Sequence, residues 1–295
     1  MQSNLYNAKR LALGTAHFGQ TYGINQIRLP DQTIAEILQT AAAHNINMLD
    51  TASAYGESEI VLGKAYKPEQ QTFQYISKMP IGTPVDQIHK RCLQSITNLR
   101  CSSLYGYLLH DYSDYELDGK YKEIVRLKER GLAKKIGISF YYPEHLERVL
   151  NENTELDLIQ IPFNVFDQRF APYFAELKKR NIEIHVRSVF LQGIFFLNPY
   201  ELPEHFNPAK PQLRALQQLS KQISAPLSSI LINFVLSFPE IDRLVIGVNS
   251  ANDLQENLSG LSHHHAVTSS LTTLKTYQLD HDEILHPGKW PRHSA

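Results

Sequence analysis

The chain repeats one pattern eight times: a short apolar run of strand-forming residues, then a segment whose apolar residues recur at helical spacing. This alternation is typical of parallel strands joined by crossover helices, and eight such units predict an α/β fold of one class, the (β/α)8 TIM barrel. The length of 295 residues suits a fold that typically needs about 250. The predicted strands are residues 11–15, 46–50, 73–78, 104–110, 133–139, 156–161, 182–187 and 243–247.

We expect a single domain over residues 1–295, because no linker or low-complexity stretch separates the units. The barrel core would span about residues 9–262. Residues 263–295 would add an extra helix, predicted at 268–277, and an irregular C-terminal tail. A doubly wound sheet is the alternative, but the sequence lacks the early glycine fingerprint of that fold.

The composition narrows the classes of partner. Lysine and arginine number 29 against 30 aspartate and glutamate residues, so the net charge is −1. This balance gives no electrostatic reason to expect nucleic acid or an anionic membrane as a partner. No apolar run reaches the roughly 18 residues of a membrane helix. Cys92 and Cys101 are the only cysteines, which indicates reduced thiols in a cytoplasmic protein. Monomer and dimer both stay open.

Four polar residues fall at or just past the ends of three successive predicted strands. Asp50 ends the second strand, and Tyr55 follows it by five positions. Lys78 ends the third strand and His110 the fourth. In this barrel such strand ends form the rim that carries active sites. A phenol with a pKa of about 10 holds its proton tightly at neutral pH, and a nearby cation favours its release. Each residue alone has a structural explanation, but the four together predict an active site.

Several segments between about residues 11 and 257 carry a family pattern: 14–19, 50–56, 58–59, 77–78, 109–110, 136–139, 160–169 and 187–193. Together they resemble the aldo-keto reductase superfamily, in a bacterial branch often linked to surface-sugar synthesis. The resemblance implies an oxidoreductase that reduces an aldehyde or ketone to an alcohol with NAD(P)H, and needs no metal. It implies that Tyr55 donates the proton and that Lys78 lowers the tyrosine pKa. Asp50 would hold Lys78 in place, and His110 would orient the carbonyl.

The resemblance also implies a set of cofactor contacts, with two departures from the family pattern. Phe140 stands where many members have an asparagine that helps hold the nicotinamide carboxamide. Arg187 replaces the aromatic residue that commonly stacks on the nicotinamide, although a planar guanidinium can also stack. The implied cofactor residues are Gly14, Thr15, Ala16, Asp50, Ser139, Gln160, Arg187, Ser188, Phe190, Gly193, Gly247, Asn249, Ser250, Asp253, Glu256 and Asn257.

The choice between the two nucleotides stays open. Members that prefer NADPH usually place a cation near the 2′-phosphate, but residues 245–257 contain no lysine or arginine, and Asp253 stands in that position. A carboxylate there would repel a phosphate. We expect NADPH on the family habit, with NADH as the alternative. Lys210, Arg214 or Lys221 of the preceding segment could supply the missing charge.

The substrate, a small carbonyl compound, would meet residues of the rim and the tail. The predicted pocket residues are His17, Tyr22, Tyr55, His110, Phe140, Phe166 and Trp290. For Trp290 the alternative is a hydrophobic anchor on the side of the barrel. His263, His264 and His265 are expected in an exposed loop, because three consecutive residues cannot all face one metal ion.

Two other classes of function stay open at this point. A non-redox barrel enzyme acting on sugars, such as an isomerase or aldolase, would use a lysine for Schiff-base chemistry but would leave Tyr55 without a role. The second is a regulatory or sensing barrel that binds the cofactor and turns over slowly.

Overall fold

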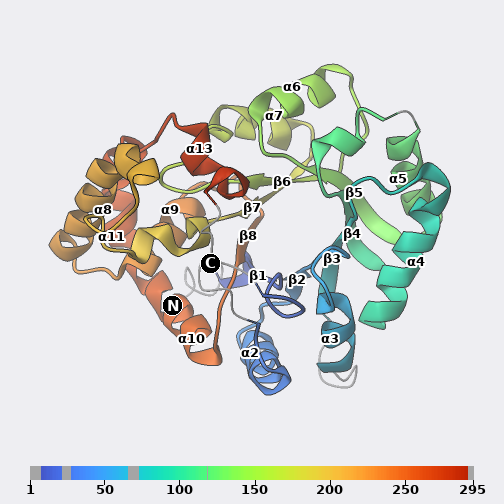
Figure 1. Ribbon diagram of the computed structural model, residues 1–295, viewed down its shortest axis with the longest axis horizontal. Coiled ribbons are helices and arrows are strands. Elements are labelled where there is room, and N and C mark those ends of the chain that lie inside the picture. The colour runs from blue at the N-terminus through green and yellow to red at the C-terminus, as the bar shows by residue number, and fades with distance from the viewer. Residues whose placement is uncertain (1–7, 22–27, 66–72, 118, 292–295) are drawn as a thin grey trace.

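The computed structural model describes residues 8–21, 28–65, 73–117 and 119–291. Its strands form one closed barrel in sequence order, in which β1 pairs with β2 on one side and with β8 on the other (Figure 1). The predicted barrel is thus confirmed. The strands are β1 (Leu11–Gly14), β2 (Met48–Asp50), β3 (Gln74–Met79), β4 (Leu104–Leu109), β5 (Ala133–Ser139), β6 (Leu158–Pro162), β7 (Glu183–Arg187) and β8 (Arg243–Ile246).

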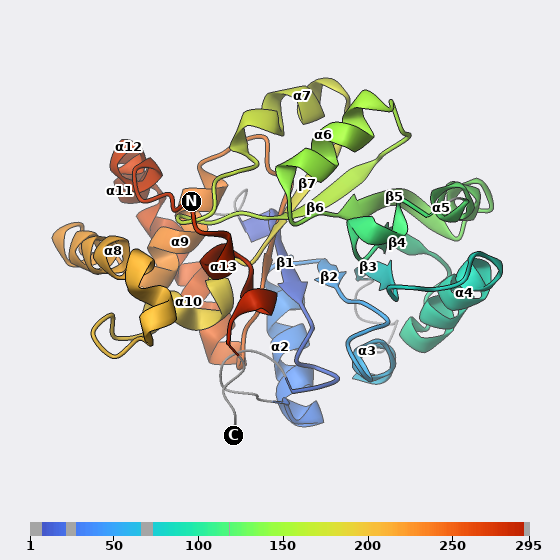
Figure 2. The same ribbon diagram turned by 45° about the horizontal axis from the view of Figure 1, so that its top comes forward.

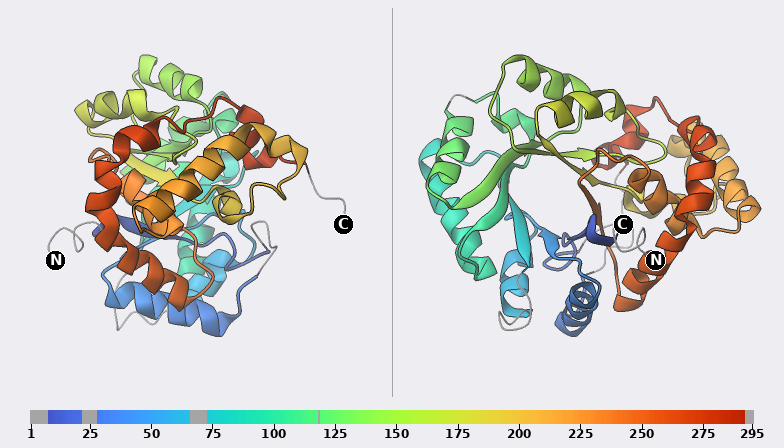
Figure 3. Two further views of the ribbon diagram at one scale, coloured as in Figure 1. Left: turned by 90° about the vertical axis from the view of Figure 1, so that its left-hand side faces the viewer. Right: turned by 180° about the vertical axis from the view of Figure 1, so that it is seen from behind.

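The helices pack around the outside of the strands, as Figures 2 and 3 show. Gly131 follows the end of one of them with a φ of 72°, a left-handed conformation that glycine adopts readily after a helix. The helices are α2 (Asp31–Ala43), α3 (Ser58–Ala65), α4 (Ile88–Leu99), α5 (Lys120–Glu129), α6 (Pro143–Asn151), α7 (Phe174–Lys179), α8 (Lys210–Gln222), α9 (Leu227–Leu236), α10 (Ala251–Gly260), α11 (His264–Ser269), α12 (Leu271–Lys275) and α13 (Asp282–Leu285).

The core has two layers. The larger lies between the strands and the surrounding helices, and it contains most of the buried apolar residues. The smaller fills the barrel itself with Ala12, Met48, Ile76, Leu108, Leu158 and Val245. A barrel of this kind is a packed core and not a pore, so the strands are fixed where they end at the rim.

The predicted helix at 268–277 is wrong in its bounds. The structure has two short helices, α11 and α12, separated at Ser270. The reason lies in the side chains, because Thr268, Ser269 and Ser270 each donate a hydrogen bond to the carbonyl oxygen four residues earlier. Such bonds compete with the helical backbone pattern and bend helices.

The histidine run also differs from its prediction. His263 ends a 3-10 turn (Leu261–His263) and His264 begins α11, so the run lies at a helix start and not in an exposed loop. His264 Nδ1 lies 3.2 Å from Asn233 Oδ1, which ties this turn to α9. Among the described residues no cluster of histidine, cysteine or acidic side chains is arranged to hold a metal ion.

In the described chain no single helix has the length and apolar character to cross a membrane. One pair, Glu204–Gln222 with Leu227–Leu236, meets those criteria only when it is joined across a bend of 97°. The eight residues from Ser229 to Leu236 are buried in the protein core, which accounts for their apolar character.

Candidate active site

The structure brings the four predicted catalytic residues together at one end of the barrel. Lys78 Nζ lies 2.9 and 2.8 Å from the two carboxylate oxygens of Asp50, and it also donates to the Thr51 carbonyl oxygen. The same Nζ atom lies 5.3 Å from the centre of the Tyr55 ring. The ring of His110 meets that of Tyr55 edge to face, with 5.7 Å between centres. The ion pair therefore lies next to the phenol.

Backbone packing fixes the loop that carries Tyr55. The Tyr55 amide donates to the Ala52 carbonyl, and the Tyr55 carbonyl accepts from the Ser58 amide at the start of α3. Gly19 of the β1–α2 loop lies so close that a Cβ atom there would come within 2.4 Å of the Tyr55 carbonyl oxygen. Only glycine allows this approach, so the glycine of the first loop helps to fix the phenol of the second.

A buried carboxylate supports the lysine strand, and sequence reasoning gave it no role. Glu59 of α3 is 4% exposed and accepts hydrogen bonds from Ser77, which precedes Lys78, and from Asn98 of α4. A buried carboxylate needs such donors to offset its lost hydration. In the sequence, only its place beside Ser58 in the family pattern points to Glu59. Its hydrogen-bond partners are distant in sequence.

Burial raises the pKa of the Tyr55 phenol above its usual value, the Asp50 carboxylate adds to the rise, and Arg187 opposes it. The expectation that Lys78 lowers this pKa stays a prediction. The lysine itself is paired with both carboxylate oxygens of Asp50. The phenol therefore keeps its proton at neutral pH, which is the state that a proton donor requires.

The imidazole of His110 is neutral at physiological pH. Burial, together with the charges of Lys78 and Arg187, lowers its pKa to about 4. Its Nδ1 atom is buried and has no hydrogen-bond partner among the described residues. A neutral imidazole next to the phenol can donate a single N–H to a substrate oxygen.

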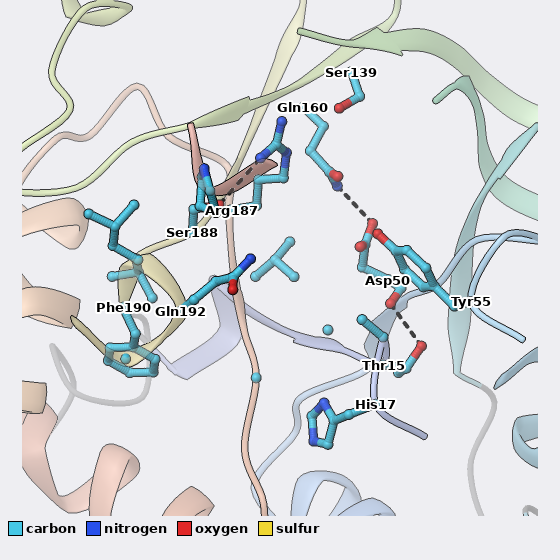
Figure 4. Close-up of a pocket in the computed structure, with 18 of the residues that line it drawn as sticks. Thr15, His17, Asp50, Tyr55, Ser139, Gln160, Arg187, Ser188, Phe190 and Gln192 are labelled. Atoms are coloured by element: carbon cyan, nitrogen blue, oxygen red, sulfur yellow. Dashed lines mark hydrogen bonds between the residues drawn. The ribbon is translucent and has the colours of Figure 1, made fainter. Parts of the chain in front are cut away.

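A cavity of about 460 Å³ opens in front of Tyr55 and His110. Figure 4 shows Asp50 and Tyr55 on one side with Gln160 beside Asp50, and Arg187 and Ser188 across from them. Predicted residues that line it are Gly14, Thr15, Ala16, His17, Asp50, Tyr55, His110, Ser139, Gln160, Arg187, Ser188, Phe190, Gly193, Gly247 and Asn249. Lining residues that sequence reasoning missed are Tyr141, Val189, Leu191, Gln192, Phe196, Leu197, Val245 and Pro287.

Gln160 shows how this cavity suits a nicotinamide. Its Nε2 atom donates to Asp50 Oδ1 at 2.7 Å, which fixes the orientation of the amide (Figure 4). Its Oε1 atom is buried and has no partner among the described residues. A buried acceptor of this kind calls for a donor from a ligand, and a carboxamide N–H is such a donor.

The loop after β7 has an unusual backbone. Ser188, Leu191 and Gln192 have φ angles of 62°, 43° and 52°, in the left-handed region that non-glycine residues rarely adopt. Such conformations persist where surrounding structure enforces them, and they cluster at ligand sites. The loop contains 3-10 turns over Leu191–Phe196, with a kink at Gln192 and Gly193.

Four predicted cofactor residues, Ser250, Asp253, Glu256 and Asn257, do not line the cavity. Instead, Ser250 and Asp253 cap α10: the Ser250 hydroxyl donates to Asp253 Oδ1, and accepts from the Asp253 amide. The Asn249 amide donates to Asp253 Oδ2 at 2.9 Å. The Asp253 carboxylate is thus held by the helix N-terminus, whose dipole it complements.

The predicted substrate pocket is only partly assembled. His17, Tyr55 and His110 line the cavity, whereas Phe140 and Phe166 are fully buried in the core. Phe166 packs against Phe195 with 4.7 Å between ring centres, which explains why its ring is turned away. Tyr22 lies outside the described residues.

Trp290 does not line the cavity but anchors the tail. Its ring meets Phe206 edge to face at 5.0 Å, and its indole N–H donates to the Ile284 carbonyl. The tail still reaches the rim, because Pro287 lines the cavity and His286 stacks on Tyr141 with 4.0 Å between ring centres. The anchor and the rim contact are therefore made by different residues of one segment.

Comparisons with known proteins agree with this geometry. The sequence model of the Aldo/keto reductase family matches residues 10–277, so the chain belongs to the Aldo/keto reductase family. It is similar to L-galactose dehydrogenase of Arabidopsis thaliana, at 23% identity over 88% of this chain and 87% of the relative. It is also 21% identical to the chloroplastic pyridoxal reductase of the same plant, over 78% of this chain and 73% of that protein.

Among solved structures, the holo form of an aldo-keto reductase from Bacillus halodurans is similar in fold. The TM-score is 0.71 at 20% identity, and the match covers 89% of this chain and 91% of that one. Membership of the family makes the protein an oxidoreductase of carbonyl or sugar substrates.

Proposed function

We propose that this protein reduces an aldehyde or ketone, of sugar type or similar, to an alcohol with NAD(P)H. The observation that carries the proposal is the arrangement of Tyr55, His110 and Asp50 on the cavity wall, with Asp50 paired with the buried Lys78. A phenol that keeps its proton and a neutral imidazole beside it form a pair of donors for one carbonyl oxygen.

In this proposal Tyr55 donates its proton to the substrate oxygen as the carbonyl carbon is reduced. His110 donates an N–H to the same oxygen, which orients it and stabilises the negative charge that develops there. Asp50 and Lys78 hold each other and the adjacent strand ends, so the two donors keep their relative position.

The cofactor supplies the hydride when it is bound. Ser139 and Gln160 would hold the carboxamide, the loop from Ser188 to Gly193 would lie along the pyrophosphate, and Gly247 and Asn249 would lie nearer the adenosine. Four further residues could contact the adenosine only if that end of the cofactor extends beyond the cavity: Ser250, Asp253, Glu256 and Asn257. We keep NADPH as the proposed nucleotide with NADH as the alternative.

The substrate class follows from the relatives, whose names state a sugar and a pyridine aldehyde. We propose the carbonyl of an open-chain sugar or of pyridoxal as the group that reaches Tyr55.

The two cysteines are free thiols in the structure, which supports a reducing compartment such as the cytoplasm.

The alternative functions fit the geometry less well. A Schiff base would need an accessible lysine, but Lys78 is 1% exposed, bound to Asp50 and Thr51, and not part of the cavity wall. A sensing barrel with slow turnover would share the cofactor contacts, and only a rate separates it from a reductase.

The test is oxidation of NADPH or NADH, followed at 340 nm, with a panel of aldehydes, aldoses and pyridoxal. A reductase is expected to oxidise many equivalents of cofactor per protein with at least one carbonyl compound. Binding of the cofactor with at most one equivalent oxidised would favour the sensing barrel. Absence of binding by either nucleotide would contradict both.

A further inference from the structure

Arg187 brings a positive charge to the cavity that no acidic side chain neutralises among the described residues. Asp50 and Arg187 are the two charged residues of the described cavity wall, and Asp50 is paired with Lys78. Arg187 forms no ion pair in the described chain; its guanidinium donates only to the Ser188 hydroxyl and the Phe140 carbonyl, both at 3.3 Å.

The guanidinium is held in place by an aromatic ring. Its central carbon lies 4.0 Å from the centre of the Tyr141 ring, a close cation–π contact, and Tyr141 stacks in turn on His286 of the tail. Figure 4 shows Arg187 between Ser188 and Gln160, across the cavity from Tyr55. These contacts position the charge at the cavity wall.

The field of this charge reaches the reacting groups. After burial and Lys78, Arg187 is the next contributor that lowers the pKa of His110, and it opposes the rise in the pKa of Tyr55. Both effects have the sign expected of a positive charge near these groups, and at each of them the Asp50 carboxylate acts in the opposite direction. The His17 imidazole, whose pKa burial lowers, brings no further charge to the wall at neutral pH.

Any hydride donor must lie within this field. The substrate oxygen must contact the Tyr55 hydroxyl, and the donor carbon must contact the substrate carbon, which together place the donor within about 8 Å of that hydroxyl. With the cofactor bound, a hydride with both bonding electrons would move from the reduced ring to the carbonyl carbon, and a proton from Tyr55 to the oxygen. The ring would change from neutral to a cation and Tyr55 to a phenolate, while the substrate would become a neutral alcohol.

We propose that Arg187 distinguishes the two redox states of the nicotinamide, because its charge repels the cationic oxidised ring and leaves the neutral reduced ring unaffected. The inference rests on the proposed function. The protein would bind the reduced cofactor much more tightly than the oxidised one, and the bound cofactor would have a higher reduction potential than the free one. Among the bound species, the equilibrium would then shift toward the carbonyl compound with reduced cofactor, which favours the oxidation of the alcohol on the protein. The oxidised cofactor would dissociate readily.

The test is calorimetric titration of the protein with reduced and oxidised forms of one nucleotide, without substrate. Arg187→Gln removes the charge and keeps polar donors, Arg187→Lys keeps the charge, and Arg148→Gln removes an exposed charge of α6 as a control. The ratio of the oxidised to the reduced dissociation constant is expected to fall about tenfold in Arg187→Gln, equivalent to about 1.4 kcal/mol. It should stay near the wild-type ratio in the other two variants.

Several outcomes would overturn the proposal. Equal loss of affinity for both redox forms in Arg187→Gln would mean that the guanidinium binds the pyrophosphate instead. An unchanged ratio with unchanged affinities would mean that its charge does not reach the ring. Arg187→Met replaces the glutamine variant if the latter does not give a cooperative thermal transition. If wild-type protein binds neither form, the proposed function fails and not this inference alone.

Discussion

At the scale of single residues, a substitution of Tyr55 can separate proton donation from cofactor binding. Tyr55→Phe removes only the hydroxyl, so the ring contacts with His110 and Lys78 persist. We expect kcat to fall by about 10² to 10⁴, the usual contribution of a general acid, with the dissociation constant of the cofactor nearly unchanged. Steady-state rates on an aldehyde and a cofactor titration measure the two quantities. A variant that keeps a tenth of the wild-type kcat would show that another group is the acid.

The pH dependence follows from the two shifted pKa values. Burial lowers the pKa of His110 to about 4, and the pKa of Tyr55 is raised above its usual 10. Between these values the phenol is protonated and the imidazole is neutral, so neither titrates. We expect kcat/KM for reduction to be constant from about pH 6 to about pH 9. It should decline as the pH falls toward the pKa of His110.

The same profile tests the role of Lys78. A loss of activity with a midpoint near pH 7 or 8 would mean that the phenol pKa is lowered after all, as the resemblance implied. The measurement should use saturating cofactor and a constant ionic strength, because surface charges are screened by salt.

Residue positions at strand ends could be predicted from the sequence, whereas side-chain directions could not. Asp50, Lys78 and His110 fall at the rim because a strand's end is set by local pattern. Phe140 and Phe166 follow strand ends by the same logic, yet both rings turn into the core. Apolar rings are buried wherever tertiary packing offers space, and that space comes from distant partners such as Phe195.

At the scale of elements, the cap of α10 bears on the choice of nucleotide. Asp253 accepts from Asn249 and Ser250 at the start of this helix. We expect Asp253→Arg to tighten NADPH and leave NADH nearly unchanged, most clearly at low salt. The same substitution removes the carboxylate that accepts these two bonds, while Ser250 stays as the N-cap, so we expect a small fall in the free energy of unfolding. Asp253→Ala is the matched control: it also loses the carboxylate but gains no cation.

Titration of each variant with both nucleotides, and thermal unfolding, give the two readouts. Wild-type protein that binds NADPH a thousandfold better than NADH would contradict the account. A cation of another segment, such as Lys210 or Arg214, would then already hold the 2′-phosphate.

The tail is the second element with a predicted effect. Trp290 fixes it against Phe206, while His286 and Pro287 reach Tyr141 and the cavity. Truncation before His286 is expected to raise KM for bulky carbonyl substrates several-fold more than for small ones, with kcat on small ones kept. Trp290→Leu, which weakens the anchor but keeps both rim residues, is the control. A mere fall in melting temperature, with equal KM changes, would indicate a structural anchor only.

At the scale of the whole molecule, the sequence predicts the barrel architecture better than it predicts the bounds of the C-terminal helix. Eight alternating units require a parallel sheet, and each local pattern agrees with its neighbours, so the closed barrel follows. Ser270 divides the predicted C-terminal helix, because backbone bonds from hydroxyl side chains compete with helical ones. The capped state of Asp253 and the partners of Glu59 depend on the folded arrangement, and the sequence alone gave neither.

The central claim is that hydride passes from a nicotinamide to a carbonyl carbon beside Tyr55. The most direct test uses NADPH or NADH deuterated at C4, stereospecifically, with a carbonyl substrate from the panel, and mass spectrometry of the product. The account predicts one deuterium on the alcohol carbon from one of the two C4 epimers, over many turnovers, and almost none with Tyr55→Phe. An alcohol without deuterium from either epimer, or no alcohol beyond one equivalent per protein, would contradict it.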